Sequence, residues 1–248
     1  MPSIRATKTG KRFAVFDIDG TLIRWQLYHA VASALLKRQS DQKPYSDIRA
    51  ARLRWKQRTH PSSFRDYEQT LIKAYEMALR ELTVKEFNNA ANAVVEEYRD
   101  QVYTFTRDLI AKLRGQGYFL LAISGSQQEL VEKIATYYGF DDCVGTHYLR
   151  QKDRFTGEKV LGSANKSDVL NRFITSHKLD LTGSYAIGDS ESDIPMLAMV
   201  EHPIAFNPTR ALFATAKKRG WTVVVERKNM VYRLEPLTKE DDGSFILA

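Results

Sequence analysis

Two aspartates stand two residues apart, Asp17 and Asp19, directly after the apolar run "RFAVF" and just before a Gly-Thr turn. A second run, "YAIG", is followed at once by Asp189 and, four residues later, by Asp193. Sites in parallel α/β sheets form at the carboxyl ends of the strands. If the two runs are neighbouring strands, three or four carboxylates therefore converge on one site.

Converging carboxylates repel one another in a partly dry site, so the cluster needs a cation or protonated members. A hard divalent ion suits a site that offers two or three carboxylates and water, and Mg²⁺ is the ion we expect. Such an ion can hold a phosphoryl group while one aspartate attacks phosphorus to give an aspartyl-phosphate. The second acid of the first pair can then protonate the leaving oxygen and activate water.

Two further residues offer groups that phosphoryl chemistry needs. Ser124 follows the apolar run "LLAI" and presents a hydroxyl to a phosphate oxygen, and Lys166 stands at a predicted helix start with a cation for the transferring group. Taken singly, each residue is readily explained as a helix cap or a solvated turn. The ordered set favours catalysis.

The pattern around these residues predicts an α/β protein whose parallel sheet carries helices on both faces. Short apolar runs typical of buried strands alternate with helical patterns. The predicted strands cover residues 13–18, 118–123, 184–189, 203–206 and 222–225. Residues 146–162 alternate around turn residues and predict a hairpin, whereas the composition of residues 233–248 predicts a poorly ordered tail.

One region breaks the alternation of strands and helices. Residues 25–105 carry three apolar stripes at helical spacing, beginning at Leu27, Tyr67 and Phe87, without a convincing strand between them. This pattern predicts a small helical domain inserted after the first strand.

Four motifs in this order resemble the haloacid dehalogenase superfamily, in its phosphatase branch and its phosphoserine-phosphatase-like subfamily. They are DxDGT at 17–21, a run ending at Ser124, Lys166, and GDSxxD at 188–193. The resemblance implies a Rossmann-like catalytic core over residues 10–24 and 106–226, a helical cap over 25–105 and a C-terminal extension over 227–248. A cap of this kind would close over the substrate and exclude water.

The resemblance also implies a role for each motif residue. Asp17 would be the nucleophile and a Mg²⁺ ligand, Asp19 the general acid/base and a ligand through its main-chain carbonyl, and Asp189 a further metal ligand. Lys166 would be catalytic and steady the phosphoryl charge. The remaining residues surround these groups: Thr21, Ser124 and Gly125 on the substrate side, Ser190 beside the metal ligands, and Asp193, which would orient Lys166 or a metal-bound water.

The chain departs from phosphoserine phosphatases at two positions that hold the substrate amine and carboxylate. The expected glutamate is Gln26, which lacks the charge, and the expected cap arginine, counted from Phe64, is Leu71. Both departures make phosphoserine a less favoured substrate.

Basic residues gather in one part of the chain. Residues 37–65 hold nine Lys and Arg against two Asp, and nine minus two gives +7, the net charge of the whole chain. A solvated helix face is one explanation and an anion-attracting surface is the other. A helix over 48–58 would place Arg49, Arg52 and Lys56 on one face, and at the mouth of the site it would favour a substrate with more charge than one phosphate.

Other features exclude whole classes of site. Cys143 is the only cysteine, which rules out an intramolecular disulfide and a cluster of thiolates that could hold zinc or iron–sulfur. The sequence shows no membrane-spanning run, no signal peptide and no nucleic-acid-binding motif, so we expect a cytoplasmic protein.

His29, near the start of the helical insert, is a weak site candidate, and Trp25 could pack against substrate although a core position is the more ordinary role for it.

The leading hypothesis is a Mg²⁺-dependent phosphatase acting on a small phosphorylated metabolite. Phosphoryl transfer to another acceptor stays open, because hydrolysis and transfer differ only in the nucleophile that enters. A non-catalytic scaffold that binds nucleic acid or anionic membrane through the basic segment is the alternative from another class.

Overall fold

A parallel sheet forms the centre of the computed structural model, which describes residues 10–36, 43–60, 62–162, 164–228, 230–236 and 245–247. Six neighbouring strands run parallel, in the spatial order β3 (Asp142–Gln151), β2 (Phe119–Gln127), β1 (Lys11–Phe16), β5 (Leu179–Gly188), β6 (His202–Phe206) and β7 (Thr222–Arg227). Antiparallel strands extend both edges: β4 (Arg154–Val160) on β3, and β8 (Met230–Pro236) then β9 (Phe245–Leu247) on β7. The predicted α/β fold with a parallel core is confirmed.

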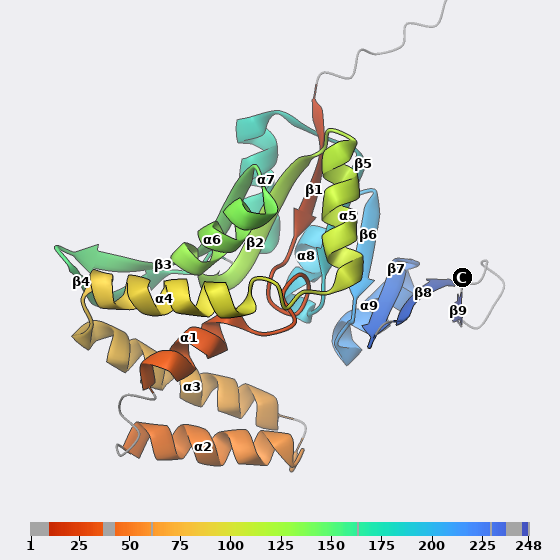
Figure 1. Cartoon of the computed structure of the whole chain (residues 1–248). Helices are drawn as coiled ribbons and strands as arrows, with labels where there is room; N and C mark the ends of the chain where they lie inside the picture. The colour runs from red at the N-terminus through yellow and green to blue at the C-terminus, as the bar shows by residue number, and fades with distance from the viewer. Residues whose placement is uncertain are drawn as a thin grey trace, which may run out of the picture.

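Strand β1 shows why both faces of the sheet are covered. Its side chains alternate, so Phe13 and Val15 enter one hydrophobic cluster and Ala14 and Phe16 enter the other. Helices α5 (Thr104–Gly115) and α6 (Gln128–Tyr138) contribute to the cluster that contains Phe16, and α7 (Lys166–His177), α8 (Ile194–Leu197) and α9 (Arg210–Arg219) contribute to the other. The two groups of helices flank the sheet (Figure 1).

Four helices follow β1: α1 (Leu27–Leu36), α2 (Lys43–Lys56), α3 (Ser63–Glu81) and α4 (Val84–Tyr98). Their apolar stripes join the cluster on the α5 and α6 side, where Tyr75 of α3 and Phe87 of α4 are fully buried. A capping box between Thr83 and Glu86 starts α4. Figure 1 shows α1, α3 and α2 stacked away from the sheet, with α2 outermost. No helix among the described residues has the length and apolar character needed to cross a bilayer.

The two edges of the sheet test two predictions. The predicted hairpin is confirmed as β3 and β4, which pair antiparallel with His147 opposite Val160. The prediction of a poorly ordered tail over 233–248 is wrong for 233–236, which belong to β8 and pair with β7 or β9, and for 245–247, which pair with β8. The rest of that predicted tail lies outside the described residues. The open edge of β7 offers unpaired backbone groups, and β8 satisfies them despite its mixed composition.

Candidate active site

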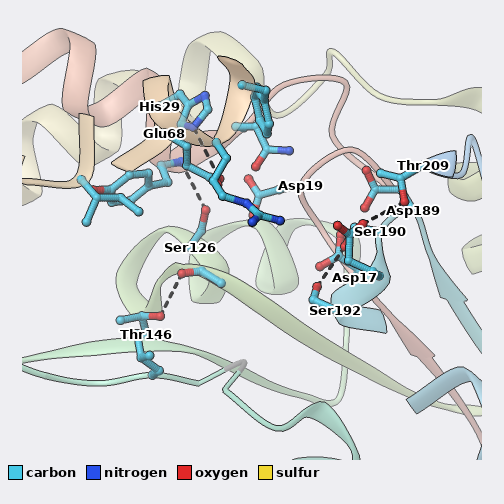
Figure 2. A pocket seen from close by; sticks show the side chains of 18 of the residues that line it. Asp17, Asp19, His29, Glu68, Ser126, Thr146, Asp189, Ser190, Ser192 and Thr209 are labelled. Atoms are coloured by element: carbon cyan, nitrogen blue, oxygen red, sulfur yellow. Dashed lines mark hydrogen bonds and ion pairs between the residues drawn. The ribbon is translucent and has the colours of Figure 1, made fainter. Parts of the chain in front are cut away.

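A cavity of about 840 Å³ lies at the carboxyl ends of β1, β2 and β5, between the sheet and helices α1 and α3. Asp17, Asp19, Lys166 and Asp189 all line it. In Figure 2 the aspartates lie on one side of the cavity, and His29 and Glu68 lie on the other. The structure therefore brings together residues from three separate strand or helix ends, those of β1, β5 and α7, as the strand pattern predicted.

The acids approach one another closely at the base of this cavity. Carboxylate oxygens of Asp17, Asp189 and Asp193 lie within 4.8 Å of one another. The Asp17 N–H donates to the carbonyl of Ile187 at 2.9 Å, which ties the end of β1 to the end of β5. Gly20 has a φ of +84°, and a side chain there would collide with the Asp189 carboxylate. The glycine turn is what allows Asp189 to approach the first motif.

Lys166, the first residue of α7, is buried among these acids. Its Nζ donates to Asp17 Oδ1 at 2.8 Å, to Asp193 Oδ1 at 2.6 Å and to the Ile123 carbonyl at 3.0 Å. Burial alone would lower the pKa of Lys166, but the two carboxylates raise it above its usual value. The lysine therefore stays charged and fixes Asp17 in position.

Asp193 has two tasks in this arrangement. While one oxygen holds Lys166, its Oδ2 accepts hydrogen bonds from the N–H groups of Asp189, at 3.1 Å, and Ser190, at 2.9 Å. These bonds shape the turn that carries Asp189. Of the two roles considered for Asp193, the geometry matches the orientation of Lys166.

The aspartates are short of positive charge. Burial raises the pKa of Asp17 to about 7, with Lys166 opposing the rise and Asp193 and Asp19 adding to it. Burial likewise raises the pKa of Asp189 to about 9, and the carboxylates of Asp17 and Asp193 add to the effect. An all-oxygen donor set that resists ionisation fits a hard divalent cation such as Mg²⁺.

This charge deficit makes stability and metal binding depend on pH. Both pKa values lie above those of an unfolded chain, about 4. Between these values the metal-free folded protein binds more protons than the unfolded chain, so its stability falls as pH rises from about 4 to about 7 for Asp17 and to about 9 for Asp189. Mg²⁺ needs the ionised carboxylates, so we expect it to raise the melting temperature more at pH 9 than at pH 6. Scanning calorimetry with and without Mg²⁺ measures this. An equal shift at both values, or a shift that persists in Asp189→Asn, would contradict the assignment.

Asp19 is held by two other elements. One oxygen accepts the N–H of Leu27 at 2.6 Å, where α1 begins, and the other accepts the Ser124 hydroxyl at 2.6 Å. Burial raises the pKa of Asp19, and the hydrogen bonds from Ser124 and Leu27 oppose the rise. A carboxyl group that resists ionisation at the cavity wall can carry a proton.

Two of the residues predicted on the substrate side do not line the cavity. Ser124 is fully buried and its hydroxyl faces Asp19 and the N–H of Ser126, while Thr21 is buried with no hydrogen-bond partner for its hydroxyl in the described chain. Neither lines the cavity, so the predicted phosphate contact of Ser124 and the predicted substrate-side role of Thr21 stay predictions. Gly125 and Ser126, the next two residues of β2, do line it. The side chain of Ser124 is therefore part of the buried core and not of the cavity wall.

The wall opposite the acids contains residues that the sequence did not single out. Arg65 and Glu68 of α3 line the cavity, as does Tyr28 of α1. Glu68 Oε1 lies 4.0 Å from His29 Nε2, and burial raises the pKa of Glu68. Burial, together with Arg52, lowers the pKa of His29 to about 4, so this ring is neutral. Only their spacing could have indicated a shared site in advance, because Arg65 and Glu68 lie about one helical turn apart on α3.

Three other sequence candidates are also placed by the structure. Gln26 lines the cavity, but Leu71 is fully buried in the core. Trp25 is 54% exposed, donates to Gln101 at 2.7 Å and does not line the cavity. No described residue of α2 lines it either, so the expectation of a basic helix at its mouth is wrong. The reason is packing, because α2 lies on the far side of α3 (Figure 1).

Comparisons with known proteins agree with this geometry. The model of haloacid dehalogenase-like hydrolases matches residues 14–198. The chain is 34% identical over 126 residues to an inhibition of morphological differentiation protein of Streptomyces azureus, covering 50% of this chain and 46% of that protein. It is 24% identical over 228 residues to a histidinol-phosphatase of Neisseria meningitidis, covering 86% of this chain and 98% of that one. It spans about half the length of the first curated relatives that it matches.

Solved structures share the fold. A Bordetella pertussis protein of unknown function superposes with a TM-score of 0.68 at 22% identity, covering 87% of this chain and 98% of that one. A phosphoserine phosphatase determined as a phospho-aspartyl intermediate analogue has a TM-score of 0.60 at 20% identity, covering 89% and 95%.

Proposed function

This chain belongs to the family of haloacid dehalogenase-like hydrolases, and we propose that it is a Mg²⁺-dependent phosphatase that cleaves a small phosphomonoester. One observation carries the proposal: Asp17 is held at the base of the cavity by the buried Lys166, at 2.8 Å, with Asp19 two residues further on. Relatives named as phosphatases, one of them a probable phosphatase of Mycobacterium tuberculosis, support it.

The proposed reaction has two steps. An Asp17 oxygen attacks phosphorus and the bond from phosphorus to the leaving oxygen breaks, while Asp19 gives its proton to that oxygen. Asp19 then takes a proton from water, whose oxygen attacks phosphorus and releases phosphate and the free Asp17 carboxylate. Lys166 keeps Asp17 oriented and balances charge on the phosphoryl oxygens. Mg²⁺, held by the carboxylates of Asp17 and Asp189 and the Asp19 carbonyl, would supply further neutralisation of that charge when bound.

Phosphate release from a panel of phosphomonoesters, with and without Mg²⁺, tests this proposal. We expect release that requires the metal and stops when it is chelated. Release that is indifferent to the metal, or no release from any ester by folded protein that binds Mg²⁺, would overturn it. In the second case, transfer of the phosphoryl group to an added alcohol would be the reaction to assay next.

We propose that residues 25–105 form a cap and that the leaving group lies against two of its helices, α1 and α3. Glu68 is the informative residue on this wall, because a carboxylate beside a phosphate site repels a simple anionic substrate. The Glu68 carboxylate would instead attract a leaving group that carries a cation. Relatives are named histidinol-phosphatase and phosphoserine phosphatase, and both names describe esters of amino alcohols. We therefore propose that the substrate carries an ammonium group that Glu68 binds, with Arg65 beside it for any anionic group.

The variant Glu68→Gln tests the leaving group. For phosphoethanolamine we expect kcat/KM to fall roughly 10- to 100-fold, as for loss of a hydrogen bond to a charged group. For ethyl phosphate, which lacks the amine, kcat/KM should hold or rise. The exposed Glu81 at the end of the same helix provides a matched control as Glu81→Gln. Equal losses on both esters would show that Glu68 does not select for the amine.

A further inference from the structure

The basic residues of α2 take no part in the proposed catalytic mechanism. Arg49, Arg52, Arg54 and Lys56 are exposed on this helix, and Arg58 is exposed just beyond it. The only acid between residues 46 and 60 is Asp47, so this short segment has five positive charges against one negative, more than half of the chain's net +7. We call these five side chains the α2 basic face.

No described group neutralises the α2 basic face. None of its five side chains makes an ion pair or a side-chain hydrogen bond within the described chain, and none lines the catalytic cavity. The buried side of α2 packs differently, through Ile48, Ala51 and a half-buried Trp55 whose ring stacks on Tyr67 at 5.1 Å between centroids. The helix is thus anchored on one side and presents unpaired cations on the other.

The position of the helix makes this face accessible. In Figure 1, α2 is the helix furthest from the sheet, with α3 between it and the rest of the fold. Cations brought close together repel one another, and an opposing anionic surface relieves that repulsion. A surface with many anions fits such a face better than one small anion does, because the five cations are spread around the helix and only Arg49 and Arg52 line a cavity, of about 100 Å³.

One apolar residue indicates which anionic surface fits. Leu53 is 55% exposed, and on the helix it lies on the side opposite Trp55. Arg49 and Lys56 flank it on one side and Arg54 on the other. A bilayer interface accepts an apolar side chain below its headgroups while the flanking cations reach the lipid phosphates. A nucleic-acid duplex offers phosphates but no apolar compartment for Leu53. Unpaired bases would need an aromatic ring to stack on. Trp55 is the one aromatic residue of α2 whose side chain is described, and its ring is already stacked on Tyr67.

We propose that the α2 basic face binds the surface of an anionic phospholipid membrane, with Leu53 entering the headgroup layer. The contact is peripheral and electrostatic, so it weakens as salt screens the charges. Each cation near an anionic bilayer strengthens binding about fivefold. The proposal is independent of the catalytic mechanism, because no residue of the face lies in the cavity.

Sedimentation with lipid vesicles tests the proposal. We expect the full chain to bind phosphatidylcholine vesicles that contain phosphatidylserine, to bind vesicles of phosphatidylcholine alone far less, and to be released by salt. The double variant Arg49→Glu/Lys56→Glu should lose more than about 25-fold in affinity, since each site loses a cation. The control Lys217→Glu/Lys218→Glu makes the same charge change on the exposed end of α9 and should bind like the unchanged protein.

A third variant separates lipid from nucleic acid. Leu53→Ser keeps every charge, so we expect it to weaken binding to the anionic vesicles and to leave any retention of duplex DNA unchanged. Circular dichroism melting confirms that each variant is folded. Failure to bind anionic vesicles, equal losses in the α2 and α9 double variants, or tighter binding to the duplex than to vesicles would each overturn the proposal.

Discussion

Replacing Asp17 by asparagine is expected to reduce phosphate release by about 10⁴-fold or more, because the amide cannot attack phosphorus. The amide is close in shape to the carboxylate and can still accept a hydrogen bond from Lys166. A continuous phosphate assay on the best ester of the panel, at saturating Mg²⁺, measures the loss. Residual activity within about tenfold of the unchanged protein would show that Asp17 is not the nucleophile.

Stability separates this chemical effect from damage to the fold. Burial raises the pKa of Asp17 to about 7, so at pH 8 the ionised side chain costs folding free energy that a neutral amide avoids. The metal-free Asp17→Asn protein should therefore unfold at the same urea concentration as the unchanged protein or a higher one. Asp108→Asn, at an exposed position on α5, is the matched control and should change neither activity nor stability.

Replacing Lys166 by methionine is expected to lower the free energy of unfolding more than any of the other single substitutions does. The side chain is 2% exposed and bridges Asp17 and Asp193, so its removal leaves two buried carboxylates without their cation. Breaking a buried pair in this way costs about 3–5 kcal/mol. Urea unfolding at pH 8 without metal measures the change, which should be smaller at pH 6 because the carboxylates can then take up protons.

A second substitution tests the cause of that loss. Asp193→Asn removes one of the two stranded charges, so the double variant Lys166→Met/Asp193→Asn should recover part of the stability lost in Lys166→Met. Activity should not recover with it, because Asp17 stays without its positioning cation. A single variant within about 1 kcal/mol of the unchanged protein, smaller than the cost of an unpaired buried charge, would contradict the account.

The sequence predicted the centre of the fold because buried parallel strands are nearly continuous apolar runs. β1 and β5 have this character, and the acids after them mark the edge where the site forms. β8 lacks it, since Tyr232 and Arg233 interrupt its apolar residues. Its place depends on the open edge of β7, a tertiary feature that local composition does not encode.

The site was predictable where residue spacing fixes geometry, and less so where packing does. Asp17, Asp19 and Asp189 follow their strands directly, and the structure places all three at the cavity. Ser124 follows the predicted strand 118–123, yet in the structure it lies within β2, where it is buried and donates to Asp19. Arg65 and Glu68 reach the cavity only through the way α3 packs on α1, which no motif in the sequence records.

The covalent step is tested most directly by trapping the phosphorylated enzyme. The protein is mixed with its best substrate and Mg²⁺, quenched in acid within the first turnover and digested, and the peptide spanning residues 13–24 is weighed by mass spectrometry. We predict that this peptide gains the mass of one phosphoryl group, carried on Asp17 and absent from Asp17→Asn. A phosphoryl group on a different residue, or substrate turnover without any phosphorylated peptide, would contradict an aspartyl-phosphate at Asp17.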